Sequence, residues 1–342
     1  MNNINVLVTG SGSLYGVAVI KSLLKSALKL KLVATDTDPR TLGLHFAHRG
    51  YIVPPAFQEG LYYEKILDII RGEKINAVFV ASSHELAFFS GHKEEIEAAT
   101  GAWVFVNPPG VMNICCDKWL TIKFLKENNF NFPGTIRYPE DRALLEKFIR
   151  EAGFPVIIKP RRGAGSEDLY KAASPQELLS LVKGREGFVL QQYLPEADGE
   201  YTTGICAGAD GRVLSAVTLK RILRDGMTMS AEADDYEHLT DYCRQVAGVL
   251  KPYGPCNFQF RLLEGRPYIF EINPRFSSST GMRCLLGINE AEILLRAEIL
   301  GEAVSPRKAV KGSIIRQYKD YIVPTGRIRQ LEKESFCVNR PG

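Results

Sequence analysis

The sequence predicts an α/β domain with a doubly wound parallel sheet, followed by two α+β subdomains. In the first third of the chain, short apolar runs alternate with amphipathic helical segments, a pattern typical of parallel strands joined by helical crossovers. From about residue 199 the strand-like runs follow one another, which indicates an antiparallel sheet. We therefore expect a first domain at 1–112, subdomains at 113–190 and 191–305, and an unassigned tail at 306–342.

The elements follow from these patterns in chain order. In the first domain we expect strands at 4–9, 31–35, 77–81 and 103–106 and helices at 17–28, 61–72 and 91–99. The next region predicts helices at 117–128, 140–152 and 175–184 and strands at 154–160, 167–172 and 187–192. The last region predicts strands at 200–208, 212–222, 255–262 and 267–273 and helices at 235–251 and 288–300.

The composition is that of a globular protein and excludes several classes. The 342 residues are 45% hydrophobic and 24% charged, and the net charge of +4 is not clustered. We therefore expect neither nucleic-acid nor membrane binding. The sequence enters a strand directly with no signal peptide, its seven cysteines show no CxxC pair, and its five histidines are scattered, so we predict a cytoplasmic protein without a zinc site.

A strand pair near the end of the third region carries oxygen ligands. Glu271 and Asn273 are two residues apart, so in a strand they face the same side, and Arg275 is next in line. The strand containing Gln259 precedes them across a short turn, and we call this pair, with Gln259, Glu271 and Asn273, the metal hairpin. Oxygen ligands with one carboxylate suit Mg²⁺. The alternative is an ordinary edge hairpin with a polar rim.

A glycine-rich loop follows the strand that ends at Lys159. Gly163, Gly165 and Ser166 lie in this loop, 161–166, where glycines allow backbone N–H groups to approach phosphate oxygens. Lys159 would add a positive charge. The loop is not a P-loop, because the chain contains no GxxxxGK[ST] motif. By itself it fits a plain flexible hairpin equally well.

A third candidate is the segment that joins the two subdomains. Gln192, Tyr193 and Leu194, here called the hinge, can offer backbone groups to an adenine edge. Among the acidic residues that follow, we favour Glu200 as a partner of ribose hydroxyls. The alternative is a set of solvated loop carboxylates.

These motifs together resemble the ATP-grasp superfamily over roughly residues 1–305. The chain looks closest to the branch of the carbamoyl phosphate synthase large chain, which also includes amino-acid and peptide ligases. The resemblance implies an N-terminal Rossmann-like domain that precedes an ATP-grasp fold of two α+β subdomains. The matching motifs fall in family order: Asp117-Lys118, Phe132-Pro133-Gly134-Thr135, Ile158-Lys159-Pro160, the glycine loop, the hinge, Asn257-Phe258-Gln259 and Phe270-Glu271-Ile272-Asn273-Pro274-Arg275.

The resemblance also implies residue roles. Lys118 and Lys159 would bind the phosphates of ATP, the glycine loop would close over them, and the hinge would hold adenine. The metal hairpin would hold one or two Mg²⁺ ions, with Mn²⁺ as an alternative, and Arg275 would face an acyl phosphate. Gln259 departs from the Asp or Glu of many ATP-grasp ligases but matches the carbamoyl-phosphate-synthase pattern, and a single ionised ligand weakens a second metal.

The implied reaction is activation of a small-molecule carboxylate by ATP, followed by attack of an amine on the acyl phosphate, with release of ADP and phosphate. The substrate half-site is expected near 277–280, with Lys220, Arg221 and Arg224 as candidate bases. We place Lys220 beside Arg275 as a catalytic residue, although each base fits a surface charge equally well. A homodimer is the usual assembly of similar proteins. Full carbamoyl phosphate synthase activity is not expected, since it needs two ATP-grasp units.

Two other classes remain open. A dinucleotide-dependent oxidoreductase would use Gly10, Gly12 and Gly16, which follow a strand, with Asp36 at the end of the next strand as the ribose partner. The glycine spacing is not GxGxxG, and this interpretation explains nothing after residue 120. A non-catalytic nucleotide-binding protein is the other alternative.

Overall fold

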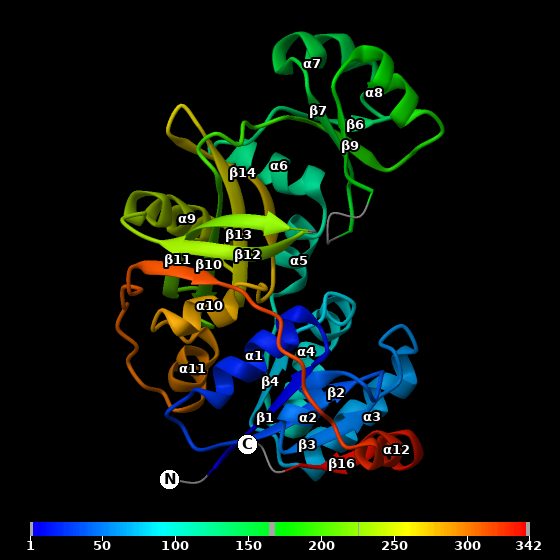
Figure 1. Ribbon diagram of the computed structural model, residues 1–342, viewed down its shortest axis with the longest axis vertical. Helices are drawn as coiled ribbons and strands as arrows, with labels where there is room; N and C mark the ends of the chain where they lie inside the picture. The colour runs from blue at the N-terminus through cyan, green and yellow to red at the C-terminus, as the bar shows by residue number, and fades with distance from the viewer. Residues whose placement is uncertain (1–2, 164–167, 225, 340–342) are drawn as a thin grey trace.

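Three sheets divide the molecule into three lobes (Figure 1). The computed structural model describes residues 3–163, 168–224 and 226–339. The N-terminal sheet lies at one end, the large sheet in the middle, and the small sheet with its two helices at the other end. The predicted fold class, a parallel sheet domain followed by α+β parts with antiparallel sheets, is confirmed.

The N-terminal sheet has the strand order β16-β3-β2-β1-β4-β5. The strands β1 to β5 are parallel to one another, and β16 pairs with β3 in the antiparallel direction. The strands run Ile4–Thr9 (β1), Leu30–Asp36 (β2), Arg49–Ile52 (β3), Ala77–Val80 (β4), Trp103–Phe105 (β5) and Phe336–Val338 (β16). The chain order reverses between β1 and β4, and such a switch point is where doubly wound sheets form a crevice.

Helices cover both faces of this sheet. On one face, α1 (Leu14–Leu24) packs with α11 (Glu290–Leu294) and the π-helical turn η2 (Leu295–Ile299). On the other face lie α3 (Glu59–Gly72) and α4 (Leu86–Thr100), while the short α2 (Leu42–Phe46) precedes β3. The helix α1 begins three residues before the predicted start because the Ser13 hydroxyl caps it by accepting from the Gly16 amide at 2.9 Å.

The small sheet has the order β6-β9-β7-β8 and is antiparallel in each pairing. Its strands are Thr135–Tyr138 (β6), Val156–Pro160 (β7), Tyr170–Ala172 (β8) and Phe188–Gln192 (β9). The helices that share its core are α7 (Leu145–Ala152), which follows the 3₁₀ turn η1 (Arg142–Leu144), and α8 (Pro175–Val182). Two helices connect the first sheet to this lobe, α5 (Pro109–Cys115) and α6 (Lys118–Glu127).

The large sheet has the order β14-β13-β10-β11-β12-β15. Its strands are Glu200–Ala207 (β10), Val213–Arg224 (β11), Met227–Ala233 (β12), Gly254–Leu263 (β13), Arg266–Asn273 (β14) and Gly312–Ile315 (β15). One face packs on α9 (Glu237–Leu250), and the other packs on α10 (Thr280–Leu285). The sequence did not predict β12, β15, α10 or the final elements α12 (Thr325–Glu334) and β16.

Candidate active site

The metal hairpin consists of β13 and β14, which pair in antiparallel register. Gln259 lies opposite Glu271, and Asn257 lies opposite Asn273, with an irregularity after Gln259. Directly opposed residues project to the same face of a sheet. The pairing therefore brings Gln259, Glu271 and Asn273 to one face, and the Asn273 amide donates to Glu271 Oε1 at 3.2 Å.

Guanidinium groups already contact both carboxamides of the metal hairpin. Arg221 Nη2 donates to Gln259 Oε1 at 2.9 Å, and Arg275 Nη2 donates to Asn273 Oδ1 at 2.9 Å. Glu271 has no ion pair within the described part of the chain. No group of three or more His, Cys, Asp or Glu side chains in that part is placed to hold a metal ion. Glu271 is the one carboxylate among the three ligands predicted for this hairpin.

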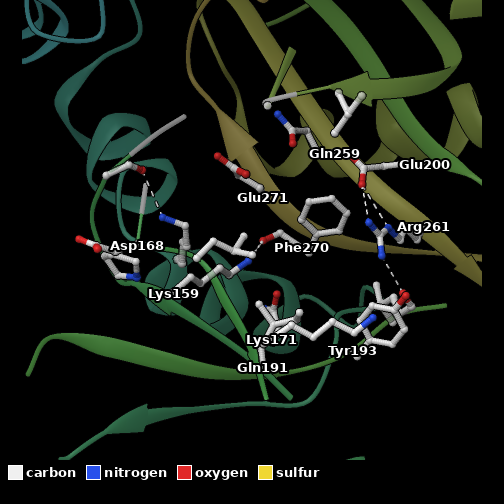
Figure 2. A pocket seen from close by; sticks show the side chains of 18 of the residues that line it. Lys159, Asp168, Lys171, Gln191, Tyr193, Glu200, Gln259, Arg261, Phe270 and Glu271 are labelled. Carbon is white, nitrogen blue, oxygen red and sulfur yellow. Dashed lines mark hydrogen bonds and ion pairs between the residues drawn. The ribbon is translucent and has the colours of Figure 1, made fainter. Parts of the chain in front are cut away.

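A cavity of about 550 Å³ separates the metal hairpin from the small sheet. Figure 2 shows the labelled side chains that converge on it from β7 and β9 on one side and from β13 and β14 on the other. Among the described residues, the cavity is lined by seven Lys and Arg side chains and by four Asp and Glu side chains: Lys118, Lys159, Arg162, Lys171, Arg221, Arg261 and Arg275 against Asp168, Glu196, Glu200 and Glu271. This excess of positive charge suits a polyanionic ligand.

The two predicted phosphate-binding lysines both line this cavity. Lys159, near the end of β7, is 5% exposed, and its ammonium donates to the Phe270 carbonyl at 3.4 Å. Burial lowers the pKa of Lys159 to about 8, and nearby Glu271 opposes part of that shift. Lys118 donates to the Gly163 carbonyl at 3.2 Å, and burial lowers its pKa as well.

The start of α6 explains why Lys118 lies beside the glycine loop. Asp117 caps the helix by accepting from the Trp119 and Leu120 amides at 3.0 and 3.4 Å. The same carboxylate accepts from Arg161 Nη2 at 2.7 Å, and the Lys118 amide donates to the Arg161 carbonyl at 2.9 Å. These bonds hold the helix start against the loop that follows β7. Gly163 lines the cavity with φ +128°.

Two further residues of the predicted loop, Gly165 and Ser166, lie outside the described residues.

The hinge residues line the same cavity, and each of them is contacted by a neighbouring residue. Gln192 Oε1 accepts from the Gly134 amide at 3.1 Å. The Lys171 ammonium lies 4.0 Å from the centre of the Tyr193 ring, and the Leu194 carbonyl accepts from Arg261 Nη1 at 2.8 Å. The structure thus brings all three hinge residues to the end of the cavity next to β9.

Glu200 begins β10 and lines the cavity, but guanidinium groups contact both of its oxygens. Arg221 Nη2 donates to Oε1 at 2.6 Å, while Arg261 donates from Nε and Nη2 to Oε2 at 3.1 and 2.8 Å. Glu196 also lines the cavity and pairs with Arg261 at 3.3 Å. Glu200, the predicted ribose partner, is therefore held in place by hydrogen bonds from Arg221 and Arg261.

Arg275 also lines the cavity and contacts residues of the N-terminal lobe. It is 6% exposed, and its guanidinium lies 3.8 Å from the centre of the Tyr15 ring. Its Nε donates to Ser83 Oγ at 3.2 Å, and burial lowers its pKa. Ser277 and Ser278 line the cavity beside it. Ser279 and Thr280 are buried, bond to neighbouring side chains and do not line the cavity.

Lys220 does not line this cavity. It lies opposite Tyr201 and Glu232 in the sheet, with its ammonium 5.9 Å from the centre of the Tyr201 ring. Since Arg221 is the next residue along the strand, the two side chains face opposite sides of the sheet. Of the three candidate bases, the structure thus brings Arg221 to the cavity but neither Lys220 nor Arg224.

Sequence reasoning missed several residues that line the cavity. Arg261 is the clearest case, because it lies two residues after Gln259 and is directly opposite Glu200 on β10. The spacing of two from Gln259 was a usable signal, but the register with β10 was not readable from the sequence. Lys171, Asp168 and Tyr15 were also missed, since their positions depend on how the lobes meet.

The glycine turn after β1 is occupied by contacts within the chain itself. The Gly12 amide donates to Asp36 Oδ2 at 2.7 Å, and the Thr37 amide donates to Asp36 Oδ1 at 2.8 Å. A Cβ at Gly12 would lie 2.3 Å from the Thr41 side chain. The Asp36 carboxylate, which the oxidoreductase interpretation needs for a ribose, therefore already accepts from one amide of the glycine turn and one of its own turn.

Two family models match separate parts of the chain. A model described as "PylC-like, N-terminal domain" matches residues 6–103, and one described as "ATP-grasp in the biosynthetic pathway with Ter operon" matches residues 185–321. The carbamoyl phosphate synthase large chain of Saccharolobus solfataricus is 24% identical over 298 residues, which are 80% of this chain. The chain spans about a quarter of the length of that relative, 27%.

Solved structures show the same fold. N5-carboxyaminoimidazole synthetase from Staphylococcus aureus matches with a TM-score of 0.71 at 15% identity, over 98% of this chain and 88% of that chain. The biotin carboxylase domain of Hydrogenobacter thermophilus 2-oxoglutarate carboxylase, solved with MgADP and bicarbonate, matches with a TM-score of 0.68 at 16% identity, over 90% and 73% of the two chains. No helix among the described residues is long and apolar enough to cross a membrane.

The N-terminal sheet and the large sheet match separate family models, and the whole chain matches solved structures in fold. The chain is therefore similar to ATP-grasp proteins, and in particular to the carbamoyl phosphate synthase large chain.

Proposed function

We propose that this protein is a Mg-ATP-dependent carboxylate–amine ligase that works through an acyl phosphate and releases ADP and phosphate. The observation that carries the proposal is a single cavity lined by the buried Lys159, the half-buried Lys118, the metal hairpin and Arg275. Positive groups around one carboxylate are the arrangement that stabilises a transferring phosphoryl group. A structural neighbour solved with MgADP and bicarbonate supports the nucleotide and the kind of acceptor.

The residues present fit a magnesium nucleotide. Glu271 and Asn273 would hold the ion, with Gln259 beside them, and a bound Mg²⁺ would neutralise phosphate charge. Lys118 and Lys159 would bind the phosphates, the hinge would hold the base, and Glu200 would face the ribose. Arg275, with Ser277 and Ser278, would bind the carboxylate that is activated.

The location and assembly follow from the same proposal. A cytoplasmic location accords with the free state of the cysteines, all seven of which lie among the described residues. We propose a homodimer, supported by the neighbouring biotin carboxylase domain, which is described as a dimer.

Hydroxylamine trapping tests the activity without knowledge of the amine. The protein is incubated with Mg-ATP, hydroxylamine and pools of amino acids, peptides and other small carboxylates. An acyl phosphate would be trapped as a hydroxamate, with one ADP released for each hydroxamate formed. Glu271→Gln should lower this rate at least 100-fold while the thermal unfolding curve stays cooperative, because the variant removes the one carboxylate among the three proposed metal ligands.

The outcomes separate the alternatives. Binding of Mg-ATP without ADP or hydroxamate from any pool would favour the non-catalytic nucleotide-binding protein. Tight NADH binding without ATP binding would favour the oxidoreductase.

A further inference from the structure

Arg221 contacts two of the groups that the proposed function assigns to the nucleotide and its metal. It is 8% exposed and lines the cavity. Its Nη2 donates to Glu200 Oε1 at 2.6 Å and to Gln259 Oε1 at 2.9 Å. Its Nε is buried and has no hydrogen-bond partner among the described residues. A buried guanidinium with an unused donor therefore stands at the Gln259 side of the cavity.

This contact changes what Gln259 can bind. A Mg²⁺ ion sits about 2.1 Å from its oxygen ligands. An ion on Gln259 Oε1 would therefore lie within about 5 Å of Arg221 Nη2, which is itself 2.9 Å from that oxygen. Two positive charges that close repel strongly where water is excluded. The Gln259 oxygen is in effect already bound by a cation.

On the other strand of the hairpin, Glu271 lacks the arginine contact that Gln259 has within the described residues. Glu271 has no ion pair within the described residues, and its carboxylate accepts a hydrogen bond from the neutral Asn273 amide at 3.2 Å. Gln259 and Glu271 are directly opposed across the two strands, and Figure 2 shows their side chains next to each other with Glu200 beyond Gln259. The hairpin therefore offers two adjacent positions for a positive charge, one at Gln259 and one at Glu271. The Arg221 guanidinium occupies the position at Gln259.

We infer that Arg221 supplies the positive charge that a second metal ion would supply, so that the site takes one divalent cation with its nucleotide. The inference rests on the proposed function, since it assigns the nucleotide to this cavity. It makes Arg221 a contact of the nucleotide phosphates on the side away from Glu271. Its consequence is that ADP keeps part of its affinity in the absence of any metal.

The test is a titration of the protein with Mn²⁺ at saturating ADP, read by electron paramagnetic resonance, alongside calorimetry of ADP without metal. The wild type should bind one Mn²⁺ for each chain. Arg221→Gln should weaken metal-free ADP binding at least tenfold and should gain a second Mn²⁺. The matched control is Arg266→Gln, which removes the same charge from an exposed position at the start of β14 and should behave as the wild type.

The number of Mn²⁺ ions that the wild type binds at saturating ADP tests the inference without any variant. Two Mn²⁺ ions for each chain would overturn the inference and leave the proposed function standing. An unchanged metal-free ADP affinity in a folded Arg221→Gln protein would also overturn it. No binding of Mn-ADP by the wild type would overturn the proposed function first.

Discussion

Lys159 shows at the level of one residue how the cavity trades stability for binding. The side chain is 5% exposed, and its pKa falls from 10.5 to about 8 because burial disfavours the ammonium. That fall corresponds to about 3 kcal/mol of unfavourable free energy in the folded protein at neutral pH. A phosphate group placed beside the ammonium would offset this cost. The residue is thus arranged for a ligand rather than for the fold.

Replacement of Lys159 by Met should therefore have opposite effects on stability and on binding. Without nucleotide, the free energy of unfolding at pH 7 should rise by up to about 3 kcal/mol, because the buried charge is gone. The ATP affinity should fall at least tenfold. Denaturant unfolding and calorimetry measure the two quantities, and a Lys159→Met protein with both values unchanged would contradict the assignment.

The lowered pKa of Lys159 also predicts how stability and ATP affinity change with pH. The unfolded chain holds this proton up to about pH 10.5, whereas the folded chain releases it near pH 8. The lysine's contribution to stability is therefore least favourable below pH 8 and improves as the pH rises from 8 to 10.5. ATP affinity should fall over the same range as the ammonium loses its proton, and the Lys159→Met protein should lack both trends.

At the level of elements, a buried ion pair braces the segment that follows the metal hairpin. Arg283 of α10 and Glu290 of α11 are both 1% exposed and pair at 2.7 Å. Arg283 also donates to Ser277 Oγ at 3.3 Å, and Thr280 Oγ1 lies 3.2 Å from Glu290. The pair therefore fixes the segment that presents Ser277 and Ser278 to the cavity.

Arg283→Met alone should destabilise the protein by about 3–5 kcal/mol, because it leaves the Glu290 carboxylate buried without its partner. The double variant Arg283→Met with Glu290→Leu should recover most of that loss, since neither charge then remains. Chemical denaturation of the two variants and the wild type measures both values. Equal losses in the single and double variants would show that packing, and not the unpaired charge, sets the cost.

The elements also show what the sequence could and could not predict. The metal hairpin was readable because its alternation, its turn and its ligands all lie within 20 consecutive residues, 254–273. The meeting of Arg221 and Arg261 at Glu200 could not be predicted in this way. Arg221 lies on β11 and Arg261 on β13, and the register of each strand with β10 between them is set by packing. The edge strand β15 was not predicted, and its exposed pattern gives no alternation to read.

At the level of the whole molecule, the N-terminal and large sheets share a buried interface. Asn107, which is fully buried, donates to the Pro255 and Pro274 carbonyls at 2.8 and 3.0 Å and accepts from the Tyr253 amide at 2.9 Å. Phe79 packs against Phe276 with ring centres 5.9 Å apart. This interface holds Arg275 in reach of Ser83. The domain boundaries predicted from the sequence stay a proposal.

The last segment of the chain completes the N-terminal sheet. Leu331 of α12 is fully buried in the core that β1 and α1 share, so Leu331→Ala should cost about 2–5 kcal/mol. The matched control is Leu179→Ala, at a position 53% exposed, which should change stability by less than about 0.5 kcal/mol. Thermal and chemical unfolding measure both variants, and equal effects would mean that α12 does not belong to the core.

The placement of β1 and β16 in one sheet has a mechanical consequence. Since β16 pairs with β3 at one edge and β1 lies inside the same sheet, a force pulling on both ends of the chain would load the N-terminal sheet directly. The lobes that form the cavity lie between these strands in the chain and would bear tension only after that sheet had yielded. In an optical trap, the first rupture should therefore be insensitive to ADP.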